Sequence, residues 1–116
     1  METIDISKTT CWPLLKSLGF HRCGTTFDGK STAFGAMKTI DTFRYVSIMP
    51  RYMYVYSETR KKHFLRFGWC ITLWAADTTI ALDTQTVLPS KLMATVENLF
   101  AEVIYPKKVE YAESAG

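Results

Sequence analysis

Apolar and polar residues alternate with a period of two along residues 64–75, and further runs between Phe20 and Asp83 are rich in aromatic and β-branched residues, so the middle of the chain is predicted to form β-strands. The clearest strand covers residues 64–75. One set of its alternate positions is apolar throughout and is assigned to the core face: Leu65, Phe67, Trp69, Ile71 and Leu73. Shorter patterned runs predict strands at residues 20–27, 30–36, 42–49, 52–57 and 78–83. Pro50 and Arg51 separate two of these runs and predict a turn or bulge, because proline cannot donate to a strand ladder.

Helical periodicity flanks this strand-rich region on both sides. A first helix is predicted from about Lys8 to Leu18, and Gly19 supplies a left-handed stop. Ser7 or Thr10 can be its N-cap, and Thr10 is preferred because the helix then has Pro13 in its first turn. A second helix is predicted from Pro89 or Ser90 to about residue 105. The apolar faces of the two helices are Trp12, Leu15 and Leu18 in the first, and Leu92, Val96, Leu99, Phe100 and Val103 in the second.

The order of these elements predicts an α+β fold. It consists of an N-terminal helix, an antiparallel sheet of five or six strands, and a C-terminal helix packed on one sheet face. Residues 1–105 form the predicted single domain and residues 106–116 a polar C-terminal tail. The chain has 116 residues, of which 47% are hydrophobic, and this is enough for one domain with a core of its own.

Composition and cysteine usage indicate a cytoplasmic protein. The chain has no apolar run approaching the ~20 residues of a membrane span. Its first residues are acidic and do not resemble a secretory signal. The three cysteines, Cys11, Cys23 and Cys70, are odd in number and irregularly spaced, which favours free thiols over a disulfide framework.

Residues 24–31, Gly-Thr-Thr-Phe-Asp-Gly-Lys-Ser, match the phosphate-binding pattern G-x-x-x-x-G-K-[ST]. In a nucleotide site Lys30 would reach the outer phosphates and Ser31 would hold Mg²⁺. The surroundings argue against this site, because the preceding strand is polar and the following residues form a weak helix. Asp28 and Gly29 are instead typical of a two-residue hairpin turn, since both tolerate positive φ. The hairpin is the preferred interpretation, and a small nucleotide-binding enzyme is the second alternative.

Other catalytic or metal-binding patterns are weak. His21 and Cys23 can share one strand face, but no C-x-x-C or H-x₃-H spacing accompanies them. Cys70 shares its predicted strand face with Arg66, which would lower the pKa of the thiol. The chain has no recognisable protease motif. The sequence therefore predicts a protein that is not an enzyme and has no metal and no cofactor.

Positive charge is concentrated in the middle of the chain. The whole chain carries a net charge of +3, whereas residues 44–66 carry six basic residues and one acidic residue. Tyrosines alternate within the same segment, so rings and cations are expected on neighbouring surfaces. The candidate partner-binding residues are Arg44, Arg51, Tyr52, Tyr54, Tyr56, Arg60, Lys61, Lys62, Arg66 and Trp74. The competing interpretation, which the pattern favours, is that the tyrosines pack as cross-strand pairs or under a helix.

These features predict a small interaction protein that binds a larger protein or ribonucleoprotein through an aromatic and basic surface. The size of the domain fits an inhibitor or adaptor of phage or mobile-element type. The first alternative is direct binding of RNA or single-stranded DNA, with bases stacked on the rings and phosphates on the cations. The sequence indicates no membrane partner, and it leaves the oligomeric state open.

Overall fold

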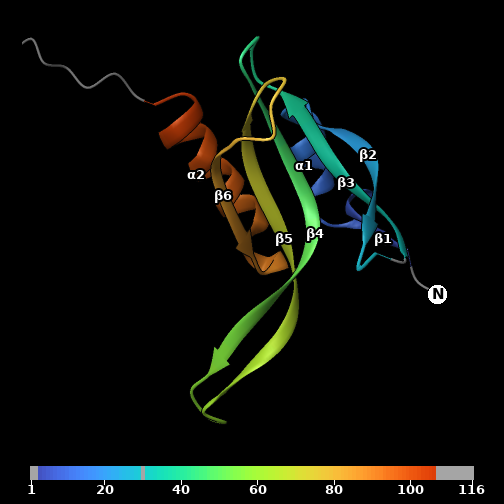
Figure 1. Cartoon of the computed structure of the whole chain (residues 1–116), viewed down its shortest axis with the longest axis vertical. Coiled ribbons are helices and arrows are strands. Elements are labelled where there is room, and N and C mark those ends of the chain that lie inside the picture. The colour runs from blue at the N-terminus through green and yellow to red at the C-terminus, as the bar shows by residue number, and fades with distance from the viewer. Residues whose placement is uncertain (1–2, 30, 107–116) are drawn as a thin grey trace, which may run out of the picture.

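The computed structural model of the chain describes residues 3–29 and 31–106 (Figure 1). The strands are β1 (Ile4–Asp5), β2 (His21–Phe27), β3 (Ser31–Thr39), β4 (Arg44–Ser57), β5 (Lys62–Ala75) and β6 (Ala81–Val87). The helices are α1 (Trp12–Ser17) and α2 (Leu92–Asn98), with 3₁₀ turns at Ile6–Lys8 and Pro89–Lys91 and a π-helical segment at Leu99–Ile104. The predicted mixed helix and strand composition is confirmed.

The six strands form one sheet in the order β1-β3-β4-β5-β6, and β2 also pairs with β3. Because β2 pairs along β3 from Ser31 to Met37, β1 and β4 share the opposite edge of β3. All pairs are antiparallel except β1 with β3, which is parallel. The predicted antiparallel sheet is therefore a mixed one. β1 was not predicted, because a strand of two residues shows no alternation.

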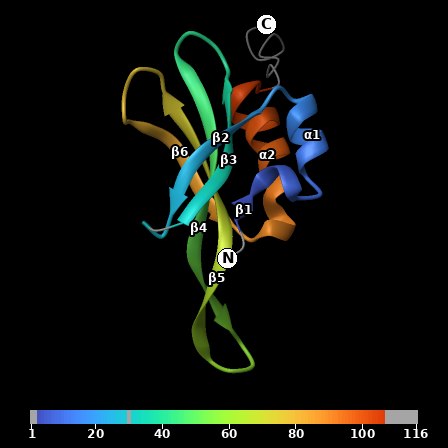
Figure 2. The ribbon, with the colours of Figure 1, turned by 90° about the vertical axis from the view of Figure 1, so that its right-hand side faces the viewer.

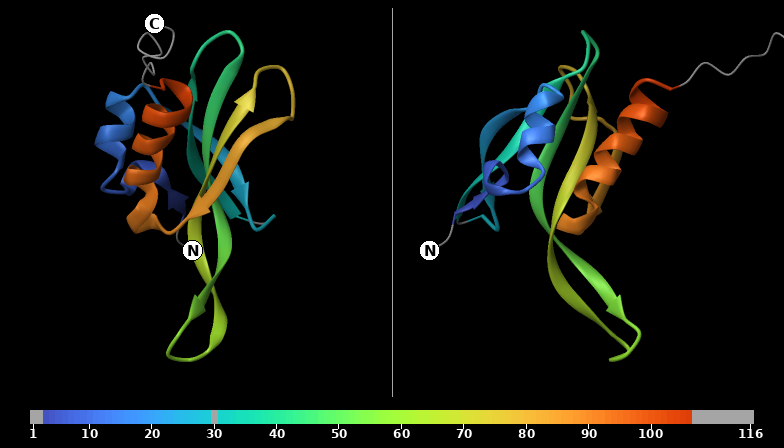
Figure 3. Two further views of the ribbon diagram at one scale, coloured as in Figure 1. Left: turned by 90° about the vertical axis from the view of Figure 1, so that its left-hand side faces the viewer. Right: turned by 180° about the vertical axis from the view of Figure 1, so that it is seen from behind.

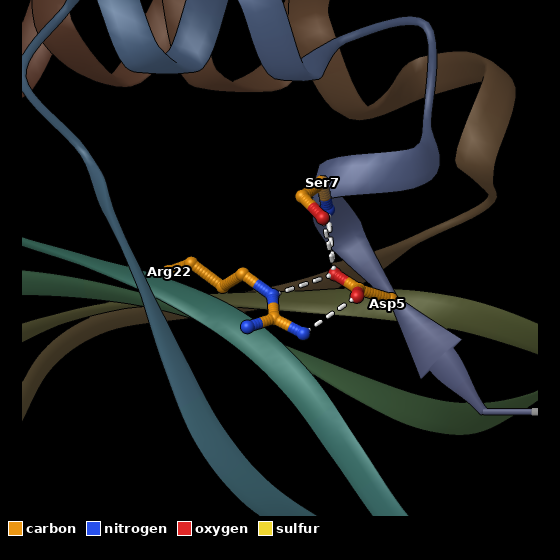
Figure 4. Close-up of polar contacts among 3 residues, drawn as sticks. All are labelled: Asp5, Ser7 and Arg22. Atoms are coloured by element: carbon orange, nitrogen blue, oxygen red, sulfur yellow. Dashed lines mark hydrogen bonds and ion pairs between the residues drawn. The ribbon is translucent and has the colours of Figure 1, made fainter.

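An ion pair between Asp5 and Arg22 joins β1 to β2 (Figure 4). Arg22 Nη2 lies 2.8 Å from Asp5 Oδ2, and Arg22 Nε donates to Asp5 Oδ1 at 3.1 Å. The backbone N–H and the hydroxyl of Ser7 also donate to Asp5 Oδ1, so this carboxylate caps the first 3₁₀ turn. These donors, Arg22 foremost, hold the pKa of Asp5 well below its usual range.

Both helices lie on the same side of the sheet (Figure 2). The core lies between the helices and the sheet. It consists of side chains from the helix-facing side of the strands and from the segments that cover them: Ile6, Leu15, Phe20, Ala36, Val46, Ile48, Trp69, Ile71, Leu73, Leu92, Val96, Leu99 and Ile104. On β5 the predicted core positions are correct from Trp69 to Leu73. They are wrong at Leu65, which is exposed, because β5 continues beyond the area that the helices cover.

The N-terminal helix is shorter than predicted. Residues 6–8 form a separate 3₁₀ turn, and α1 has only six residues. Its N-cap is Cys11, which makes no side-chain capping bond, so the predicted Thr10 cap is wrong. Pro13 sits in the first turn, and Gly19 follows the helix with φ of +96°. The predicted left-handed stop at Gly19 is confirmed.

The C-terminal helix changes its winding after Asn98. The backbone N–H of Tyr105 donates to the carbonyl of Phe100, five residues earlier, which adds one residue to the turn. This extra residue moves the buried face on by one position, so Ile104 is buried and Val103 is exposed. Helical spacing from Leu99 predicted the opposite, because it assumes a regular α-helix throughout.

β4 runs without interruption through Pro50, and the predicted turn or bulge there is wrong. Pro50 pairs with Trp69 of β5 and is buried. The pairing of β4 with β3 ends at Ile48, so no strand needs a hydrogen bond from Pro50 on that edge. Proline is tolerated in a strand at such an edge.

Two further strand boundaries differ from the predictions. The hairpin of β2 and β3 is confirmed, with positive φ at Asp28 and Gly29. The last residue pair of this hairpin joins Phe27 to Ser31. β6 begins at Ala81, later than predicted. Residues 78–80 belong to the preceding connection, where Thr78 folds back on Ala75.

Candidate interaction surface

The hairpin of β4 and β5 projects well beyond the rest of the sheet (Figures 1 and 3). β3 pairs with β4 no further than Ile48, and β6 pairs with β5 no nearer the turn than Trp69. The two strands then pair only with each other over seven residue pairs, from Arg51–Gly68 to Ser57–Lys62. At ~3.3 Å per residue this is an extension of roughly 20 Å. We call residues 51–68 the arm.

The strand register gives the arm two different faces. Cross-strand partners point to the same side of a ribbon, and successive residues point to opposite sides. The aromatic face consists of three facing pairs: Tyr52 with Phe67, Tyr54 with Leu65, and Tyr56 with His63. The basic face contains Arg51, Lys62, Phe64 and Arg66, together with Arg60 of the turn, whose guanidinium lies over the Phe64 ring. The three tyrosines thus lie on the opposite face of the arm from Arg51, Lys62 and Arg66.

The aromatic face is largely open to solvent. Its members are exposed by 45% at Tyr52, 72% at Tyr54, 46% at Tyr56 and 50% at Leu65. The interpretation that a helix covers the tyrosines is therefore wrong. Cross-strand packing does hold for Tyr56, whose ring centroid lies 5.1 Å from that of His63.

Phe27 of the β2–β3 hairpin supports the root of the arm. Its ring centroid lies 4.7 Å from that of Tyr52 and 5.8 Å from that of Phe67. Phe67 in turn packs edge-on against Trp69 at the rim of the core. The part of the arm next to the body is therefore fixed to it, whereas Tyr54, Leu65 and the residues nearer the turn extend past this support.

Three cations surround one ring on the basic face. The Phe64 ring centroid lies 5.2 Å from Arg60 Cζ, 5.1 Å from Lys62 Nζ and 5.8 Å from Arg66 Cζ. These are cation–π distances, and the half-buried ring holds the three groups near one another. Glu58 is the one carboxylate of the arm sequence. Both ion pairs found within residues 3–29 and 31–106 lie outside the arm.

The structure does not bring all predicted partner-binding residues together. Arg44 begins β4, far from the arm, and its guanidinium pairs with Asp41 at 2.8 Å. Trp74 stacks on Tyr45 in the body and donates its indole N–H to Ser47 Oγ at 2.8 Å. Arg44 was predicted to join the tyrosines because it belongs to the same basic segment, and Trp74 because it was placed on the same strand face as Arg66. A fourteen-residue strand, however, separates its ends by about 45 Å.

Eight of the ten predicted residues do lie on the arm, on different sides of it. The three tyrosines form the aromatic face, four basic residues belong to the basic face, and Lys61 occupies the turn with φ of +52°. Sequence reasoning missed Phe64 as the centre of the basic cluster and Leu65 as part of the aromatic face. The alternation of side chains around Arg66 places Phe64 on the same face as Arg66 and Leu65 on the opposite face. It could have identified both residues if the length of the strand had been known.

Cys70 lies beside the arm on the sheet face away from the helices. It borders a hollow of about 360 Å³ that is also lined by Arg51, Thr72 and Thr84. Burial opposes ionisation of the thiol, yet hydrogen bonds from Thr84, Thr72, Thr86 and Arg51 lower its pKa below the ordinary value. The predicted partner, Arg66, is not among these donors. Arg51 approaches instead, with Nη1 3.9 Å from Sγ.

The segment that matches the phosphate-binding motif crosses the β2–β3 hairpin. Residues 24–27 end β2, and β3 starts at Ser31, so no helix follows the turn. Lys30 lies outside the described residues. Burial raises the pKa of Cys23, the candidate ligand beside His21. Within residues 3–29 and 31–106, no three His, Cys, Asp or Glu side chains are grouped as metal ligands would be.

A second exposed apolar area lies at the opposite end of the sheet. Phe43 of the β3–β4 connection and Ile80 and Leu82 around the start of β6 are all more than half exposed. A hollow of about 450 Å³ opens near them, lined in part by Tyr45 and Asp77. The charged residues that line this hollow balance one another, Lys38 and Arg44 against Asp41 and Asp77, whereas those of the arm are mostly basic.

None of the helices in the described part of the chain is long and apolar enough to cross a membrane. Comparisons of the chain with family models, with curated proteins and with solved structures found no match in any of the three.

Proposed function

We propose that this chain is a non-catalytic interaction protein that docks on a larger protein or ribonucleoprotein through the arm, with the aromatic face making the central contact. The observation that supports it most is the exposure of Tyr52, Tyr54, Tyr56 and Leu65 on one side of a projecting ribbon. Contiguous exposed apolar surface of this kind marks interaction sites in soluble proteins.

The residue types on this face suit the centre of an interface. Tyrosine contributes a large rigid ring and a hydroxyl, and it is enriched among the residues that dominate binding free energy. Tyr52 and Tyr56 are held in place by Phe27 and His63, so little side-chain entropy is lost when they bind. Tyr54 is the most exposed of the three and is expected to contribute most.

The shape of the arm supports a role as an inhibitor or adaptor. A ribbon roughly 20 Å long that extends from a small body can enter a cleft of a larger partner. Such a two-stranded extension is only marginally stable by itself, so its retention in the fold is best explained by a contact that it makes. We place this contact in the cytoplasm, where the three free cysteines would stay reduced.

The test is a pull-down of the tagged protein from its source cell, with and without nuclease, in parent and variant forms. The arm variant carries Tyr52→Thr, Tyr54→Thr and Tyr56→Thr, because threonine suits a strand. The matched control carries threonine at Phe43, Ile80 and Leu82, which removes as many exposed apolar side chains from the opposite end of the sheet.

The expected result is a stoichiometric protein partner that survives nuclease treatment, is lost with the arm variant and is retained with the control. A partner retained by the arm variant and lost with the control would move the interface to the opposite end of the sheet. Recovery of no protein partner by the parent would overturn the proposal.

A further inference from the structure

We propose that the basic face of the arm binds the phosphate backbone of double-stranded DNA, with the arm lying as a two-stranded ribbon along the major groove. This inference rests on the proposed function in taking the arm as the docking element. It adds a second ligand on the side of the ribbon that faces away from the tyrosines.

The distribution of charge is the first argument. The arm has five basic residues and one acidic residue, a net charge of +4, in a chain whose total is +3. The remaining residues together are therefore slightly acidic, with nine basic and ten acidic side chains. The positive charge excess is thus carried by one projecting element, as expected for a surface that contacts a polyanion.

The cluster around Phe64 is the second argument. Arg60, Lys62 and Arg66 each lie within 6 Å of this one ring, although like charges at short range repel one another. Neither ion pair of the described residues supplies them with a carboxylate. A row of phosphates would relieve the repulsion and occupy the N–H donors that both guanidinium groups present.

The separation of the two faces decides between kinds of nucleic acid. Proteins that bind single strands stack bases on rings beside the cations that hold the backbone. Here the exposed tyrosines point away from the cations, and Phe64 is half-buried beneath them. This arrangement can hold a phosphate backbone but offers no free ring to an unpaired base. A duplex, whose bases stay stacked, fits it better than a single strand.

The dimensions of the arm fit the groove of a B-form duplex. Its two strands lie about 4.8 Å apart, and the major groove, about 12 Å wide, admits a two-stranded ribbon. The major groove of an RNA duplex is too deep and narrow for side chains to read, so DNA is the preferred duplex. The tyrosines would face away from the DNA and stay available to a protein partner.

The experiment measures binding of the full-length protein to a fluorescent mixed-sequence DNA duplex by anisotropy, over a range of salt concentrations. The arm variant is Arg60→Gln/Lys62→Gln/Arg66→Gln. The matched control neutralises three exposed lysines of the helical layer, Lys8, Lys16 and Lys91, and so has the same net charge. If three to four phosphates are contacted, affinity should fall about 40- to 150-fold between 50 and 200 mM salt.

The expected result is that the arm variant binds the DNA duplex at least about tenfold more weakly than the control at low salt. The slope of log K against log salt should also be less steep for the arm variant, by about 2.7. Equal binding by the two variants would overturn the proposal. So would tighter binding of single-stranded DNA or duplex RNA than of duplex DNA, or equal binding of polyglutamate. The proposed function is tested separately, because its partner survives nuclease and depends on the tyrosines.

Discussion

Removing the outer part of the arm should abolish binding while leaving the fold intact. The perturbation replaces residues 54–65 with Asn-Gly, so that Met53 and Arg66 flank a two-residue turn. These two residues are directly paired in the parent. Pro50 has no N–H to donate to Trp69, so these two residues form a non-hydrogen-bonded pair. Hydrogen-bonded and non-hydrogen-bonded pairs alternate along an antiparallel ladder, so the third pair beyond Pro50, Met53 with Arg66, is a hydrogen-bonded one. Met53 and Arg66 therefore form the kind of pair that a two-residue turn closes.

The expected change in the free energy of unfolding is small and follows from where the core lies. No member of the hydrophobic core cluster comes from residues 51–68. The contacts of Phe27 with Tyr52 and Phe67 stay, because both of those residues remain. A two-stranded ribbon contributes close to nothing by itself. Shortening the connection from twelve residues to two lowers the loop-closure cost by about 1.5 kcal/mol, so we expect a change between about 0 and +1.5 kcal/mol.

Urea denaturation followed by tryptophan fluorescence measures this change, since Trp12, Trp69 and Trp74 all lie outside the deleted segment. The expected variant unfolds in one transition at a midpoint equal to or above that of the parent, and it recovers neither protein partner nor DNA. A loss of more than about 2 kcal/mol would refute the reasoning, because the arm would then stabilise the body. Retained binding would refute both proposals for the arm.

Two further predictions concern ionisable groups. The pKa of Asp5 is depressed, Arg22 being the main cause, so the pair adds stability that is full above the unfolded pKa of about 3.9 and declines as the pH falls below it. Urea denaturation at pH 7 and pH 3 should show a stability gap between parent and Asp5→Asn that narrows in acid, and a constant gap would contradict this. Burial disfavours the Cys70 thiolate and hydrogen-bond donors favour it, so Arg51→Met should raise the pKa of Cys70. Thiolate absorbance against pH, in a variant whose other two cysteines are serine, measures this value, and an unchanged value would remove Arg51 as a cause.

Regular alternation and helical spacing predicted most of the fold. The core positions of β5 from Trp69 to Leu73 and the helix stop at Gly19 are confirmed, because each depends on local pattern alone. The errors arise where tertiary context overrides local pattern. Pro50 sits within β4 because the neighbouring strand has already ended, and Ile104 replaces Val103 because the helix winds more widely. Neither cause can be read from adjacent residues.

The candidate site shows the same limit more sharply, because its character depends on the length of one turn. Four residues separate Ser57 from Lys62, and this spacing places Tyr54 opposite Leu65 and Arg66 opposite Met53. A turn shorter by one residue would shift every pair, since a slip of one residue exchanges the faces of a strand. Tyrosines would then face basic residues, and stacked bases beside bound phosphates would be the natural interpretation. The sequence predicted tyrosines and cations together because it left this register open. The register separates them, and for that reason the arm is better suited to a protein on one side and a duplex on the other than to a single strand held by both.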